Sequence, residues 1–143
     1  MASVLSVAWV YIASNQYGYN SEMLKIFGLN TYPLFAWAIV LFIFVNLYFF
    51  LENVLEFSGK IKKILLFMGL YWSLLILGET IWYHVFDIQN VATAMYSGLP
   101  ICDCLHAPLW MQVSYFAMGP VYFVMCEGVV LFHSKFLVNI IRK

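Results

Sequence analysis

One polar stretch of the sequence brings together side chains that bind metal ions or take part in thiol chemistry. Residues 102–106 contain two cysteines, an aspartate and a histidine, directly before an apolar segment. The preceding apolar segment ends in a second histidine and aspartate, about one helical turn apart. Thiolates and imidazole are the ligands that copper and zinc prefer. The sequence therefore predicts a copper or zinc site built from Cys102, Cys104, His106, His84 and Asp87.

The cysteine spacing leaves other interpretations open. Outside the cytoplasm the compartment permits a disulfide, either within the Cys102–Cys104 pair or to a partner chain. The two thiols could also pack as small hydrophobic groups, with Asp103 capping the next helix. The pair is not a standard structural zinc pattern, which would show C-x-x-C spacing.

A second group of polar side chains lies inside an apolar segment expected to be helical over residues 64–86. At about 100° per residue, seven side chains share an arc of about 140°: Trp72, Ser73, Glu79, Thr80, Tyr83, His84 and Asp87. Such a stripe avoids lipid and faces another helix, a partner protein or a water-filled crevice. Glu79, Thr80 and Tyr83 are predicted to form a proton relay or polar contacts between helices.

Three apolar segments are long enough to hold these residues in a membrane. Residues 32–51, 64–86 and 107–132 each reach the length of about 20 residues that a spanning helix needs. The expected fold is a single all-α integral membrane domain, a bundle of three or four transmembrane helices with an extracytoplasmic loop over residues 87–106. Residues 1–13 are expected to form a short apolar helix that is interfacial, half-inserted or the end of a fourth span, in that order.

The positions of the basic residues predict the orientation of the bundle. Three lysines lie within residues 60–63, and further basic residues follow the last apolar segment, whereas residues 87–106 contain no Lys or Arg. Basic residues concentrate on the cytoplasmic side. Loop 52–63 and the C-terminus are therefore expected in the cytoplasm. Residues 1–13 lack the basic start of a secretory signal peptide, so they are expected to stay on the chain.

The aromatic and sulfur side chains are interpreted as interface and packing residues. Four rings cluster where the helices should leave the membrane, as in an interfacial belt: Trp82, Tyr83, Tyr96 and Trp110. The last segment repeats methionine every seven residues with tyrosines between, at Met111, Tyr115, Met118, Tyr122 and Met125. This stripe is typical of helix packing, and a Cu(I) path is the minor alternative.

Composition excludes several classes of function. Hydrophobic residues make up 64% of the 143 residues and charged residues 10%, against about 25% charged in soluble domains. Seven basic and seven acidic residues cancel, so the chain lacks the basic surface that nucleic-acid binding requires. It also lacks a phosphate-binding glycine loop, a G-x-S-x-G elbow and an H-E-x-x-H helix.

Three functions from different classes remain. The first is a noncatalytic accessory subunit of a membrane oxidoreductase complex, surrounded by lipid and by other integral membrane subunits. The second is an intramembrane enzyme acting on a lipid or isoprenoid, with Glu79 as acid and His84 as base or as the group that orients it. The third is a copper- or zinc-handling protein that uses the residue 102–106 stretch.

Overall fold

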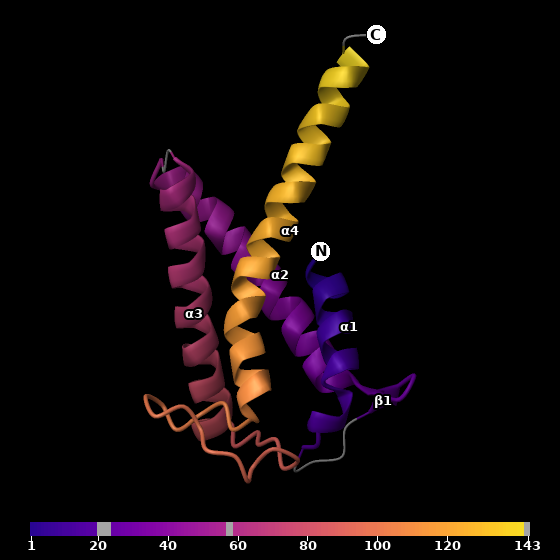
Figure 1. The fold of residues 1–143 in the computed structure, drawn as a ribbon, viewed down its shortest axis with the longest axis vertical. Helices are drawn as coiled ribbons and strands as arrows, with labels where there is room; N and C mark the ends of the chain where they lie inside the picture. The colour runs from indigo at the N-terminus through magenta and orange to yellow at the C-terminus, as the bar shows by residue number, and fades with distance from the viewer. Residues whose placement is uncertain (20–23, 57–58, 142–143) are drawn as a thin grey trace.

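The computed structural model describes residues 1–19, 24–56 and 59–141, with side chains described up to residue 128. Its elements are, in order, α1 (Ala2–Ile12), a 3₁₀ turn (Ser14–Gln16), β1 (Lys25–Ile26), β2 (Leu29–Asn30), α2 (Thr31–Val54), α3 (Lys60–His84) and α4 (Leu109–Ile141) (Figure 1). The two short strands pair antiparallel just before α2.

Three of these helices are long and apolar enough to cross a membrane: Thr31–Val54, Lys60–His84 and Leu109–Gly128. The three predicted helices are thus confirmed in length and composition, which is consistent with a multi-pass membrane protein. Helix α3 begins about four residues earlier than expected and takes in the lysines of residues 60–63. Lysine stems can lie along apolar surface while the ammonium groups stay in water, so these residues suit a helix end at a membrane surface.

The start of α2 follows from ordinary capping chemistry. The side-chain oxygen of Asn30 accepts a hydrogen bond from the backbone N–H of Tyr32 at 3.0 Å, and Pro33 lies in the first turn, where it costs no hydrogen bond. At the other end of α2, Glu52 pairs with Lys63 at the start of α3. This ion pair holds the two helices together where the chain reverses.

Helix α1 stands beside α2 rather than lying apart from the bundle (Figure 1). Ser6 donates a hydrogen bond to the backbone carbonyl of Leu34, and Trp9 and Val10 are buried. Eleven residues extend about 16 Å, roughly half of a bilayer core. Whether α1 is interfacial, half-inserted or the end of a fourth span stays a prediction.

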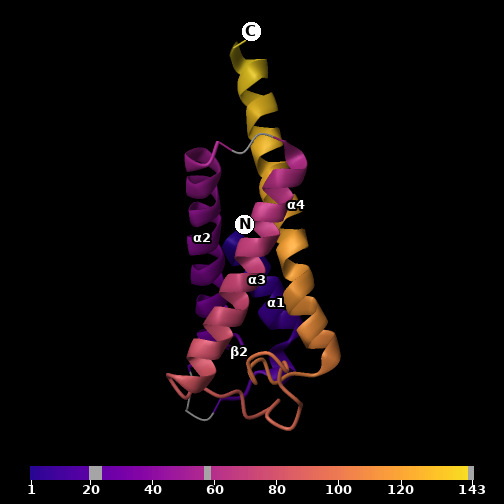
Figure 2. The same cartoon turned by 90° about the vertical axis from the view of Figure 1, so that its left-hand side faces the viewer.

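The bundle has two different ends. At the closed end the chain passes from α2 to α3 near Val54 and Lys60, and at the loop end the long connection leads from α3 to α4 (Figures 1 and 2). Helix α2 leans away from α3 toward the loop end in Figure 1, whereas the same ends lie near each other in Figure 2. At the loop end α1 packs between α2 and α4, since the ring of Trp9 lies 6.2 Å from that of Trp110 and 5.2 Å from that of Tyr115. Four helices therefore surround this end.

An aromatic cluster joins α2, α3 and α4 at the closed end. The ring of Phe67 lies 4.6 Å from Phe44, 4.9 Å from Tyr48 and 5.0 Å from Phe123. The hydroxyl of Tyr122 donates to the carbonyl of Leu41 at 3.2 Å. The cluster fixes the positions of the three helices at the closed end.

Candidate functional site

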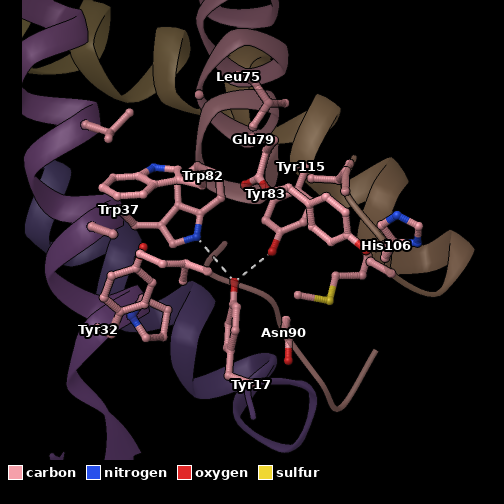
Figure 3. Close-up of a pocket in the computed structure, with 18 of the residues that line it drawn as sticks. Tyr17, Tyr32, Trp37, Leu75, Glu79, Trp82, Tyr83, Asn90, His106 and Tyr115 are labelled. Carbon is pink, nitrogen blue, oxygen red and sulfur yellow. Dashed lines mark hydrogen bonds between the residues drawn. The ribbon is translucent and has the colours of Figure 1, made fainter. Parts of the chain in front are cut away.

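A cavity of about 130 Å³ lies at the loop end of the bundle (Figure 3). Its wall is drawn from three helices, the segment after α1 and the connection between α3 and α4, and it contains the rings of Tyr17, Tyr19, Tyr32, Trp37, Trp82, Tyr83 and Tyr115. Amphipathic rings supply apolar surface together with a few hydrogen-bonding groups. Concave, mostly apolar sites with few polar groups are the usual form of a small-molecule site, but such sites usually measure about 300–1,000 Å³, so this cavity can hold only part of a lipid chain.

Glu79 is the one acidic side chain among the described residues that line this cavity. It comes from α3, and its carboxyl group lies among the labelled rings of Figure 3. No hydrogen bond or ion pair joins it to any residue in the described part of the chain. A carboxyl group held in this way is available to a ligand, because it can donate a proton as an acid or pair with a cation as a carboxylate.

A buried hydroxyl group connects the walls of the cavity. The phenolic oxygen of Tyr17 accepts hydrogen bonds from the indole N–H groups of Trp9 at 2.7 Å and Trp37 at 3.3 Å, and it lies 2.9 Å from the hydroxyl of Tyr115. Burial raises the pKa of Tyr17 to about 12. The phenol is therefore neutral at physiological pH and acts as a hydrogen-bonding group that links α1, α2 and α4.

The polar side chains that were predicted to form one stripe on α3 contact several different parts of the structure. Tyr83 lines the cavity, and its ring stacks on that of His106 at 4.7 Å. Thr80 donates to the carbonyl of Ile76 at 2.6 Å and also lies 3.7 Å from the sulfur of Cys104. Thr80 thus makes a polar contact between α3 and the loop.

The structure does not bring Glu79 and His84 together in the cavity. His84 is exposed, and its Nε2 lies 2.9 Å from the carbonyl oxygen of Cys102. The two residues are five positions apart, so their side chains differ by about 140° around the helix. His106 is the histidine that lines the cavity.

The five predicted metal ligands are engaged in other contacts. Cys102 and Cys104 form a disulfide, one of the alternatives that the sequence left open. The ring nitrogens of His106 face the carbonyl oxygens of Tyr96 at 2.8 Å and Asp103 at 3.2 Å. Asp87 accepts a hydrogen bond from Gln89 at 2.7 Å. Within the described residues no three His, Cys, Asp or Glu side chains gather to hold a metal ion, so copper or zinc binding stays a prediction that requires the reduced loop.

The disulfide loop closes the end of the cavity. Cys104 is fully buried, and Leu105, His106 and Ala107 line the cavity wall. Gly98 permits this close approach, because a Cβ atom there would lie 2.9 Å from both the carbonyl oxygen of Cys104 and Nε2 of His106.

Asn90 ties the same connection to the segment after α1. Its side-chain oxygen accepts from the backbone N–H of Gly18 at 3.0 Å, and its side-chain nitrogen donates to the carbonyl of Gln16 at 2.7 Å. The cavity end is therefore closed by two segments that hold each other in place.

Reducing the Cys102–Cys104 disulfide is expected to loosen this loop while lowering the free energy of unfolding by only about 1–2 kcal/mol, because the bridge closes a very short ring. The amides of Cys102 and Asp103, which donate to the carbonyl of Leu99 at 3.1 and 2.8 Å, should exchange faster with deuterium. Hydrogen-exchange mass spectrometry with and without reductant measures this. A double Cys102→Ser, Cys104→Ser variant should exchange fast without reductant, and unchanged exchange on reduction would contradict the role of the bridge.

Several cavity residues were not predicted to belong to a site. No pattern in the sequence indicated Tyr17, Tyr32 or Trp37. Trp82 and Tyr83 were interpreted as part of an interfacial belt, and Tyr115 as part of a packing stripe. The stripe does pack, since Met111 and Met118 are buried. The signal that could have found the site is the gathering of Tyr and Trp near the same ends of helices that carry a buried acid.

No protein-family model, curated protein or solved structure matches this chain.

Proposed function

We propose that the chain is an intramembrane enzyme that uses Glu79 as an acid on an isoprenoid or other apolar lipid bound in the cavity. The observation that supports this most is the Glu79 carboxyl group, which faces an aromatic cavity without a hydrogen-bond or ion-pair partner among the described residues. Ionisable groups within membrane helices are costly and commonly mark functional sites.

The surroundings of the cavity suit an apolar substrate. Small residues, Ala36 and Gly78, line it from α2 and α3. A Cβ atom built on Gly78 would meet no atom within 4 Å. We expect a lipid chain to reach the cavity from this side, between α2 and α3, without passing through water.

The reaction class that fits this site needs no second substrate. Proton transfer from Glu79 to one carbon of a double bond forms a C–H bond and leaves a carbocation and the Glu79 carboxylate. Loss of a proton from a neighbouring carbon to that carboxylate restores the acid and shifts the double bond, with or without ring closure in between. The aromatic rings that line the cavity can stabilise the positive charge through cation–π attraction.

Deuterium transfer tests this function directly. Wild-type protein in lipid nanodiscs, in heavy water and with a panel of isoprenoid lipids, should place deuterium on carbon in at least one of them, as detected by mass spectrometry. Glu79→Gln should lower this rate about 100-fold or more, as expected for loss of a general acid. Glu127→Gln is the matched control, because Glu127 lies on α4 and does not line the cavity. Absence of transfer in the wild type, or equal rates in Glu79→Gln, would refute the proposal.

We also propose that loop 87–106 lies outside the cytoplasm, with loop 52–63 and the C-terminus inside. The Cys102–Cys104 disulfide suits an oxidising compartment, and the lysines of residues 60–63 begin the opposite end of α3. A membrane-impermeant reductant added from outside should open the disulfide in sealed cells. Opening only after the cells are permeabilised would reverse the orientation.

The accessory-subunit function stays a prediction, as does metal handling. The exposed apolar faces of the helices, such as those carrying Phe35, Phe42 and Leu77, suit contact with lipid and with other membrane subunits equally. Mass spectrometry of the native species after gentle extraction distinguishes these cases. Partners at fixed stoichiometry would favour the subunit, and a lone chain would exclude it.

A further inference from the structure

The hydrogen bonds around Tyr17 can be assigned by counting donors and acceptors. An indole N–H can only donate, and a phenolic oxygen has two lone pairs and one hydrogen. Trp9 and Trp37 donate to the oxygen of Tyr17 and so occupy both lone pairs. The hydrogen of Tyr17 must then go to the oxygen of Tyr115, 2.9 Å away.

This assignment leaves the hydroxyl hydrogen of Tyr115 unused. Its oxygen accepts from Tyr17, and no further hydrogen bond joins the hydroxyl to any residue that the structure describes. Figure 3 shows the two dashed contacts that run from the Tyr17 hydroxyl to Trp37 and Tyr115, at the edge of the cavity that Glu79 also faces. The cavity is therefore the place where the hydrogen of Tyr115 can find an acceptor.

The ring of Tyr115 is held firmly in this position. It is 5% exposed, stacks on Trp37 at 5.1 Å and contacts Trp9 at 5.2 Å. Its backbone carbonyl accepts a hydrogen bond from the hydroxyl of Tyr71 at 2.9 Å. A donor fixed in advance loses little freedom when a ligand binds, so it contributes to affinity and orientation.

We propose that Tyr115 is a second ligand-contacting group of this cavity, donating a hydrogen bond to an oxygen acceptor on the substrate of Glu79. The inference rests on the proposed function and narrows its substrate class to isoprenoids or lipids that carry an ether, epoxide or carbonyl oxygen. A pure hydrocarbon would leave the buried donor unpaired, and sites built to hydrogen-bond a substrate discriminate strongly against analogues that lack the partner.

The test compares two ligands that differ in one acceptor. Binding of radiolabelled farnesyl methyl ether and of radiolabelled farnesene is measured on the full chain in nanodiscs. The wild type should bind the ether about tenfold more tightly, the equivalent of one well-placed hydrogen bond. Tyr115→Phe should remove this preference and leave the affinity for farnesene within about twofold.

Tyr122→Phe is the matched control, because its hydroxyl is also buried and hydrogen-bonded but belongs to the closed end of the bundle. It should leave the preference for the ether intact. Equal weakening of both ligands by Tyr115→Phe would reduce Tyr115 to a packing role and overturn the inference. The inference would also be overturned if the wild type bound neither ligand or showed no preference for the ether. This comparison on the wild type tests the inference even if Tyr115→Phe fails to fold.

The outcomes separate this inference from the proposed function. A preference that depends on Tyr115, without deuterium transfer, would uphold the ligand contact and refute the enzyme. Transfer that depends on Glu79, without preference for the ether, would uphold the enzyme and refute the Tyr115 contact.

Discussion

Phe67→Ala is expected to lower the free energy of unfolding by about 3 kcal/mol or more. Phe67 is 0% exposed, and its ring contacts rings of α2 and α4 at centroid distances of 4.6–5.0 Å. In a membrane the loss comes mainly from packing, since lipid tails are as apolar as the protein interior. Removing the ring takes away contacts with two helices at once and leaves a void that the joined helices cannot fill.

Unfolding by a denaturing detergent in mixed micelles measures this effect. Phe42→Ala is the matched control, because it removes the same ring from a helix position that is 63% exposed. We expect the control to change the free energy by less than about 0.5 kcal/mol. Similar losses in the two variants would mean that the cluster around Phe67 does not hold the bundle together.

The helices could be predicted from the sequence because they depend on local properties. A run of about 20 apolar residues is required by the thickness of the bilayer, and the segment predicted over residues 32–51 is present as Thr31–Val54. The start of α3 at Lys60 was missed by about four residues. Lysines lower the hydropathy of the segment although their stems suit a helix end, so a search for apolar runs excludes them.

The cavity could not be predicted because its contacts join distant parts of the chain. Tyr17 and Tyr115 are 98 residues apart, and nothing in either local pattern indicates the other. The polar stripe on α3 did indicate Glu79 as a candidate site residue. An arc of about 140° is wide, however, so side chains at its two edges can contact different parts of the structure. This width explains why His84 was grouped with Glu79 although it contacts the loop outside the cavity.

The cysteine loop shows a different limit of local reasoning. Spacing alone was compatible with metal binding, a disulfide or inert packing, because each can involve two cysteines that lie close together. The outcome depends on the backbone between and beyond them, where Asp103 and Leu105 adopt φ values of 44° and 57°. Such left-handed conformations are uncommon for these residues, and they are maintained by the packing of the loop against α3 and the cavity.

Gly119→Ala is expected to lower the free energy of unfolding by about 1–3 kcal/mol and to disturb the cavity. An added Cβ atom would lie 2.6 Å from Cδ1 of Tyr71. That ring is buried and packs edge-on against Phe44 at 5.6 Å, while its hydroxyl donates to the carbonyl of Tyr115 at 2.9 Å. The ring can move away only by weakening contacts that position α4 beside α3.

Gly69→Ala provides the control, since a Cβ atom on that α3 glycine would meet no atom within 4 Å. Detergent unfolding should show little loss for Gly69→Ala and a clear loss for Gly119→Ala. A double-mutant cycle with Tyr71→Ala identifies the cause, because without the ring the cost of Gly119→Ala should fall to near zero. If Gly119→Ala still lowered the free energy of unfolding in the Tyr71→Ala background, the strain would lie elsewhere on α4. Contacts other than the hydrogen bond from Tyr71 would then hold Tyr115 in position.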